Sequence, residues 1–240
     1  MVSSHKSLVS CLFVAALAVG CGGGGGDTAP APETSAMSFP LAQIAQSVVQ
    51  ERGSYPVRLE GTETYNGESA PVTGSGTVSL SIGSGTFEGA VHAERRVSVT
   101  GSVSVRGVTV PIAANVREYY GPETKPIGRI DGDSYCVYEG QSPIPASVKV
   151  GDSGSWYNSV CYTSSAKVSR VSTSSATYVI EPDSATTALL KLVQRVNSGS
   201  GQGNVAVASY RITSAGSYTK VSENSASAVD GVLLNLTVRY

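Results

Sequence analysis

The feature that most constrains the fold is a period-two alternation of apolar and polar residues, which recurs between glycine-containing turns. Successive side chains of a β-strand point to opposite faces, so this pattern is typical of strands with one buried and one solvated face. The clearest apolar sets are Val78, Leu80 and Ile82; Val97, Val99, Val103 and Val105; Val108, Val110, Ile112, Ala114 and Val116; and Val232, Leu234, Leu236, Val238 and Tyr240. They predict an all-β domain.

Short turns join these segments, among them Asn66-Gly67, Arg106-Gly107 and Asp230-Gly231. Two-residue turns with glycine favour hairpins and therefore antiparallel pairing. We expect a mainly antiparallel sheet of about ten strands. It could be a sandwich, a barrel or a curved half-barrel, and the sequence leaves that choice open.

One short N-terminal helix is predicted beside the sheet. Its apolar residues lie at helical spacing, at Leu41, Ile44, Ala45, Val48 and Val49. Ser38 is a suitable cap, Pro40 suits the first turn and Gly53 suits the stop. We expect this helix to lie on the sheet or to plug one end of it. Residues 186–196 fit either a helix or a strand, and the loop-forming run that follows, residues 198–203, favours a strand.

The N-terminus reads as an export signal. Lys6 precedes an apolar run from Leu8 to Val19, which is too short to span a bilayer as a helix. The run ends in Leu17-Ala18-Val19-Gly20-Cys21, which resembles the lipobox of bacterial lipoproteins, with Ala18 where the family usually has leucine. The resemblance implies cleavage before Cys21 and diacylation of its sulfur. The family's inner-membrane retention signal is an aspartate after the cysteine, and Gly22 in that place implies the outer membrane.

Three segments follow from these observations: a signal peptide over residues 1–20, a Gly-, Pro- and Ser-rich tether over residues 21–37, and a β-rich exported domain over residues 38–240. The protein is thus predicted to be a lipid-anchored component of the bacterial cell envelope. Its periplasmic or surface orientation stays open.

The chain has four cysteines. Cys11 lies in the signal and Cys21 is the lipidation site, which leaves Cys136 and Cys161 in an oxidising compartment. We expect these two to form a disulfide, with two buried free thiols as the alternative. The one histidine outside the signal, His92, and the absence of cysteines at ligand spacing argue against a zinc site. We expect neither a metal nor a cofactor.

Charge excludes some partners. The chain has 17 Lys and Arg residues against 18 Asp and Glu, and they are scattered. No basic stripe suggests nucleic acid, and no basic cluster suggests anionic lipid. The membrane partner is therefore expected through the lipid anchor alone, and the exported domain is expected to be monomeric.

A catalytic hypothesis rests on Ser153. Residues Gly151-Asp152-Ser153-Gly154-Ser155 resemble part of the nucleophile motif of chymotrypsin-like serine proteases. The family continues with glycine and proline, whereas this chain has Ser155 and Trp156. Roughly 60 residues separate His92 from Ser153, too few for the two barrels that assemble such a triad. A β-turn explains the motif equally, and we expect no enzymatic activity. The acidic pair Asp131 and Asp133 could similarly be part of a calcium site or simply a hairpin turn.

Aromatic residues near the cysteines form the richest candidate binding surface. They are Tyr119, Tyr120, Tyr135, Tyr138, Trp156, Tyr157 and Tyr162. Tyr and Trp combine an apolar body with a polar tip and suit binding sites, although they also fill the cores of β domains. The leading hypothesis is a non-catalytic binding or structural role toward an apolar ligand or an envelope protein.

One alternative remains for the whole domain. The alternation that ends at Tyr240 resembles the last strand of outer-membrane β-barrels, and a small integral barrel would need an apolar band on every strand. A serine hydrolase that uses Ser153 is the other alternative.

Overall fold

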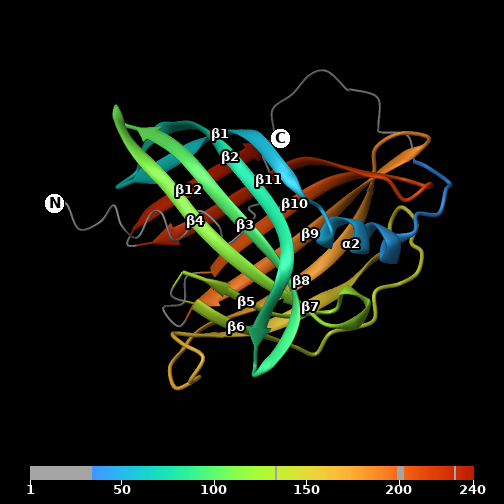
Figure 1. Ribbon diagram of the computed structural model, residues 1–240. Coiled ribbons are helices and arrows are strands. Elements are labelled where there is room, and N and C mark those ends of the chain that lie inside the picture. The colour runs from blue at the N-terminus through green and yellow to red at the C-terminus, as the bar shows by residue number, and fades with distance from the viewer. Residues whose placement is uncertain (1–33, 133, 199–202, 230) are drawn as a thin grey trace.

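The computed structural model describes residues 34–132, 134–198, 203–229 and 231–240. Within them, twelve antiparallel strands form one closed barrel in which each strand neighbours the next along the chain and β1 pairs with β12 (Figure 1). The strands are β1 Gly53–Tyr65, β2 Glu68–Phe87, β3 Ala90–Val105, β4 Val108–Tyr120, β5 Pro126–Asp131, β6 Ser134–Glu139, β7 Ser153–Tyr162, β8 Arg170–Pro182, β9 Thr187–Ser198, β10 Gly203–Thr213, β11 Tyr218–Val229 and β12 Val232–Arg239. The predicted all-β antiparallel class is confirmed, and the barrel is the form that it takes.

The barrel has twelve strands, where about ten were expected. The strands β5 and β6 have only six residues each. Strand β11 is rich in serine and alanine and shows no clean apolar alternation. Such segments carry little periodic signal, so their pairing with neighbours is what identifies them. Residues 187–198 form the predicted strand β9.

Side-chain alternation points the apolar faces inward. On β1, Val57 and Leu59 are buried, whereas Arg58 and Glu60 are exposed. Residues directly opposite each other on neighbouring strands share a face. Leu59 lies opposite Gly74 on β2 and opposite Val238 on β12, so these residues face the same side of the wall. A cluster of buried residues from β1 to β4 and β12 fills this half of the interior: Val57, Leu59, Val72, Val78, Leu80, Val99, Val103, Ile112, Leu234 and Leu236.

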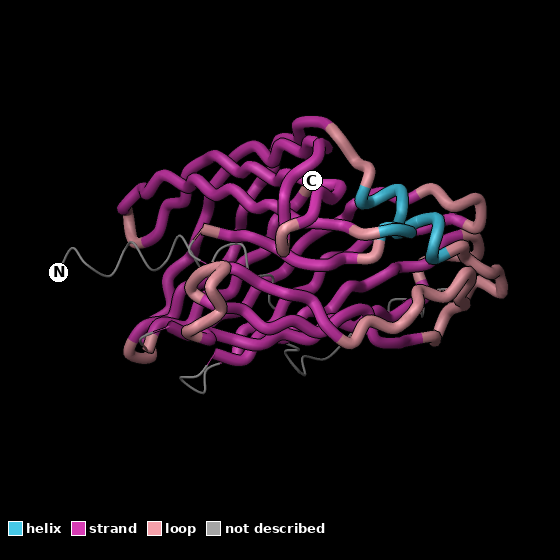
Figure 2. Tube along the Cα trace, turned by 60° about the horizontal axis from the view of Figure 1, so that its bottom comes forward, coloured by secondary structure: helices cyan, strands magenta, loops and turns pink. Residues whose placement is uncertain are grey.

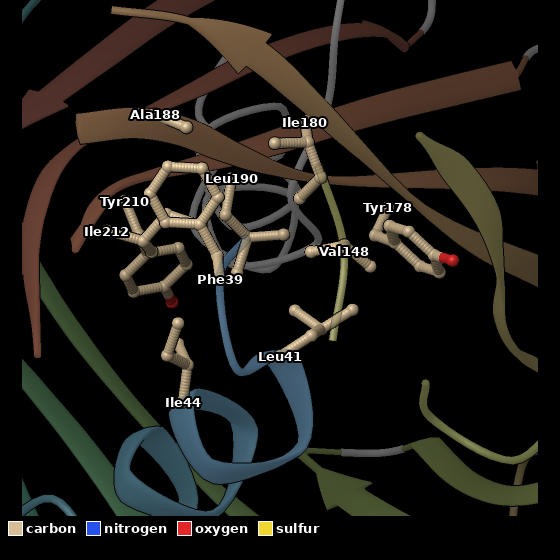
Figure 3. Packing of buried hydrophobic residues seen from close by; sticks show 10 residues of the cluster. All are labelled: Phe39, Leu41, Ile44, Val148, Tyr178, Ile180, Ala188, Leu190, Tyr210 and Ile212. Atoms are coloured by element: carbon tan, nitrogen blue, oxygen red, sulfur yellow. The ribbon is translucent and has the colours of Figure 1, made fainter. Parts of the chain in front are cut away.

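The helix α2, Leu41–Val49, plugs one end of the barrel, where Figure 2 shows it beside the loops that connect the strands. Its side chains Leu41 and Ile44 pack with Phe39 against inward-facing residues of β8, β9 and β10 (Figure 3). This second core contains Phe39, Leu41, Ile44, Val148, Tyr178, Ile180, Ala188, Leu190, Tyr210 and Ile212. The predicted helix is confirmed, and of the two expected placements it takes the one at an end of the barrel.

The ends of the helix differ from the sequence prediction. Ser38 does not cap it: Pro40 occupies the N-cap position without a side-chain hydrogen bond. The Ser38 hydroxyl instead lies 2.6 Å from that of Ser147, and Phe39 forms a β-bridge with Val148. These contacts attach the start of α2 to the β6–β7 loop. Gly53 begins β1 and lies beyond the end of the helix.

One stretch of the wall has a free edge. β4 pairs with β5 only through Val116–Tyr120, so the edge of β4 over residues 108–115 faces no strand in the described part of the chain. Pro111 lies within this stretch. Proline has no backbone N–H and is found at strand edges, so its position agrees with the missing neighbour.

Candidate functional site

A cavity of about 160 Å³ lies inside the barrel directly beneath α2. The helix supplies one apolar wall through Ala45, Val48 and Val49, and strand β9 adds Leu190 and Leu192. The remaining lining consists of the polar residues Arg95, Glu118 and Thr124, the aromatic residues Tyr120, Tyr138, Trp156, Tyr157 and Tyr210, and the apolar residues Pro126 and Ile144. The space is large enough for several water molecules or a small ligand.

Arg95 and Glu118 are the two charged residues in this lining. They lie opposite each other on β3 and β4, and Arg95 Nη1 donates to Glu118 Oε2 at 2.9 Å. Their side chains are 13% and 23% exposed. Burial opposes ionisation of Glu118, but the neighbouring Arg95 outweighs it and holds the pKa of this carboxyl below its usual value. The cavity therefore contains an ionised pair.

Tyrosines surround the pair. Tyr120 donates its hydroxyl to Glu118 Oε2 at 3.0 Å. The rings of Tyr138 and Tyr157 stack with centroids 4.4 Å apart and an interplanar angle of 7°. Burial raises the pKa of Tyr120 and Tyr138 well above the ordinary value, so both hydroxyls stay protonated and can donate.

A second ion pair lies on the neighbouring strand β5, where Arg129 is opposite Glu118. Arg129 Nη2 is 3.3 Å from Asp131 Oδ2, and Arg129 lies opposite Cys136 on the neighbouring strand. The Nε atoms of Arg95 and Arg129 are both buried without a hydrogen-bond partner. Buried donors are normally satisfied, so these two atoms are unusual in a protein interior.

An open vestibule of about 320 Å³ adjoins the cavity. The β4–β5 loop and the β6–β7 loop form it, and it shares Thr124, Pro126, Ile144 and Trp156 with the inner cavity. Glu123 and Thr124 in the β4–β5 loop have positive φ angles of 55° and 57°, a conformation that costs energy in residues with a side chain. The vestibule therefore adjoins the inner cavity on the side of α2 where these two loops lie.

The apolar half of the barrel offers much less room. A cavity of only about 30 Å³ remains among Val57, Leu59, Val78 and their neighbours, enough for one or two water molecules. At its edge Lys220 lies 3.0 Å from Glu223 and donates to the hydroxyl of Tyr240 at 2.6 Å. The interior is therefore packed at one side and hollow beneath α2.

The structure divides the predicted aromatic surface between two faces of the wall. Tyr120, Tyr138, Tyr157 and Trp156 line the internal cavity. Tyr119 and Tyr135 belong to a separate cluster, in which both rings stack on Phe87 with centroids 4.8 Å away. Tyr162 lies opposite Tyr135 in the β6–β7 register. The seven residues thus do not form one continuous surface.

The predicted disulfide between Cys136 and Cys161 is present. The two cysteines lie opposite each other on β6 and β7.

The elements of the catalytic hypothesis lie apart. His92 is on β3, which is flanked by β2 and β4, whereas Ser153 begins β7, which is flanked by β6 and β8. Asp152 forms a turn with Lys149, whose N–H donates to the carboxylate at 2.7 Å. Asp131 pairs with Arg129, and Asp133 lies outside the described residues. Among the described residues, no group of three or more His, Cys, Asp or Glu side chains could hold a metal ion.

Sequence reasoning missed Arg95 and Glu118, although a signal for both was present. Arg95 has the same parity as Val97 and Val99, and Glu118 continues the apolar series that ends at Ala114 and Val116. A charge on the apolar face of a strand predicts a buried charge, and buried charges are paired or functional.

Comparison with protein-family models, curated proteins and solved structures finds no match for this chain. The signal peptide, Cys21 and residues 21–33 of the predicted tether lie outside the described residues. Within those described, no helix is long and apolar enough to cross a membrane.

Proposed function

We propose that this protein is an envelope lipoprotein, anchored through Cys21, whose barrel binds a small ligand in the cavity beneath α2. The observation that carries the binding role is a cavity that combines a buried ion pair, stacked tyrosines and an open vestibule. Ligand sites are typically apolar clefts with a few placed polar groups, which describes this cavity.

The lipobox-like run that ends at Cys21 supports the anchor. Acyl chains on one cysteine give stable membrane attachment when there are two or more of them, because each buried CH₂ contributes roughly 0.8 kcal/mol. An anchored barrel has no need to cross the bilayer itself.

The polarity of the barrel wall supports a domain that stays outside the bilayer. An integral barrel turns an apolar band toward lipid, and a basic residue at the bilayer midplane costs roughly 2–4 kcal/mol. Here exposed charged residues occur on strands around the barrel, at Arg58 and Glu60 on β1, Arg117 on β4, Arg195 on β9 and Arg211 on β10. The buried apolar clusters of these strands lie inside the barrel, and the apolar side chains exposed on the same strands include Tyr65 on β1 and Val108 on β4.

The shape of the interior supports binding. Barrels of eight strands are just filled by their own side chains, and wider ones enclose cavities. With twelve strands this barrel leaves room that α2 fills only in part. The vestibule then gives a ligand access without opening the sheet.

Metabolic labelling with palmitate tests the anchor. We expect the full chain to be labelled, the Cys21→Ser variant to lose the label, and the matched Cys11→Ser variant to keep it. Label that persists in Cys21→Ser contradicts the anchor. Retention of Cys21→Ser in membranes after alkaline washing, with a heat-modifiable band on gels, would favour the integral barrel.

Native mass spectrometry of the full chain tests the binding role. We expect an excess mass that disappears on denaturation. The Ala45→Trp variant should lose it, because Ala45 is buried and lines the cavity. Gln46→Trp is the matched control on the exposed face of α2 and should retain it. An excess mass that Ala45→Trp keeps would place the ligand elsewhere.

A further inference from the structure

The charge of the cavity lining restricts what can bind there. Its two charged residues have opposite signs and pair with each other, so the lining as a whole is neutral. A charged ligand would find no free opposite charge in this site, because Arg95 and Glu118 already neutralise each other. Burying an unpaired charge is far more costly than burying a polar group that finds a hydrogen bond.

The same pair offers both kinds of hydrogen-bond partner. Arg95 has five donor N–H groups, of which Nη1 bonds to Glu118 and the buried Nε has no partner. Glu118 is a pure acceptor when ionised, and both hydrogen bonds that it receives, from Arg95 and Tyr120, reach Oε2. A donor and an acceptor therefore lie side by side at one wall.

The other walls favour a flat ring. The stacked rings of Tyr138 and Tyr157 and the indole of Trp156 are part of the lining, and Ala45 and Val48 of α2 add aliphatic surface. Aromatic side chains bind rings by offset stacking or edge-to-face contact. A volume of about 160 Å³ limits the inner cavity to a molecule of about one ring.

We propose that the inner cavity binds an uncharged, ring-sized molecule that carries an acceptor beside a donor, and that Arg95 and Glu118 recognise these two groups as a pair. This inference rests on the proposed function of internal ligand binding. An amide is the simplest group with this arrangement, because its carbonyl accepts from Arg95 while its NH₂ donates to Glu118. Sugar hydroxyls present the same chemistry.

Three isosteric probes test the charge preference at neutral pH: benzamide is uncharged, benzoate is an anion and benzamidinium is a cation. Their binding to the full chain is measured by ligand-observed NMR and by the shift in Tm. We expect benzamide to bind at least about tenfold more tightly than either ion. A preference of the wild type for benzoate or benzamidinium overturns the inference.

The Glu118→Gln variant tests the role of the pair. It leaves Arg95 without its counter-charge, so the preference should move toward benzoate by at least about tenfold. The double variant Arg95→Gln/Glu118→Gln is the matched control, and it should discriminate little among the three probes. If Glu118→Gln does not fold, the order of affinities for the three probes in the wild type and in the double variant still tests the role of the pair. An unchanged ranking in the double variant overturns the role of the pair.

The outcomes separate this inference from the proposed function. Binding of any probe that Ala45→Trp abolishes and Gln46→Trp preserves upholds internal binding, even where the charge preference is wrong. Absence of binding for all three probes, together with a bare native mass, contradicts both.

Discussion

Arg95 on β3 and Glu118 on β4 face each other across neighbouring strands inside the barrel, with Nη1 2.9 Å from Oε2. Both side chains are largely removed from bulk water, and Tyr120 adds a further hydrogen bond to the carboxylate. Breaking a buried pair on one side costs roughly 3–5 kcal/mol, because a charge remains without compensation. The pair thus contributes to the fold as well as to the cavity.

The first prediction concerns acid. The pKa of Glu118 is depressed in the folded state by Arg95, so the folded state binds fewer protons than the unfolded state in the acid range. The contribution of Glu118 to the free energy of unfolding is therefore fully present above its unfolded pKa of about 4.5 and is lost as the pH falls through the lower folded value. Urea unfolding at a series of pH values measures this.

The Glu118→Gln variant provides the reference for this measurement. Asp131 works in the opposite sense, since burial raises its pKa, so the total pH dependence is mixed. The difference between the wild type and the variant isolates Glu118 and should shrink below pH of about 4.5. If the difference in the free energy of unfolding between the wild type and the variant stayed constant with pH, the pKa of Glu118 would not be depressed in the folded state.

The second prediction concerns the plug. Ile44 of α2 is fully buried against β9 and β10 residues. Ile44→Ala should lower the free energy of unfolding by roughly 2–5 kcal/mol, through lost burial and the space that is left. Gln46→Ala, on the exposed face of the same helix, should change it by less than about 0.5 kcal/mol. Equal effects of the two substitutions would mean that the helix is not docked in this way.

The third prediction concerns Gly128 on β5. A methyl group on this residue would lie 2.0 Å from Cζ of Phe87, a ring already stacked on Tyr119 and Tyr135. Gly128→Ala should destabilise the protein by roughly 1–3 kcal/mol through overpacking. Gly83→Ala is the control, because an added methyl there meets nothing within 4 Å. Thermal unfolding compares the two, and a neutral Gly128→Ala would contradict the packing of Phe87.

The fourth prediction concerns the disulfide. The cysteines are 25 residues apart in the sequence. Cys136→Ser/Cys161→Ser should lower the free energy of unfolding by about 3.5 kcal/mol, from the greater freedom of the unfolded chain. Urea unfolding with and without a reductant measures it. The reductant should reproduce the loss in the wild type and have no effect on the double variant. A reductant effect on the double variant would point to another cause.

Local pattern was enough to determine the all-β class, the helix at Leu41–Val49 and the pairing of the two cysteines. Each depends on information carried by neighbouring residues: the period of two, the period of three to four, and the few thiols available in the domain.

Only the tertiary structure decided the closure of the sheet, the burial of Arg95 with Glu118 and the division of the tyrosines between two faces. Closure depends on the pairing of β1 with β12, whose residues are far apart in the chain and have no shared local signal. Parity within a strand tells which residues share a face, but the face that becomes the interior is set only when the barrel closes. Tyr119 and Tyr120 illustrate this: as neighbours on β4 they point to opposite faces, and only Tyr120 reaches the cavity.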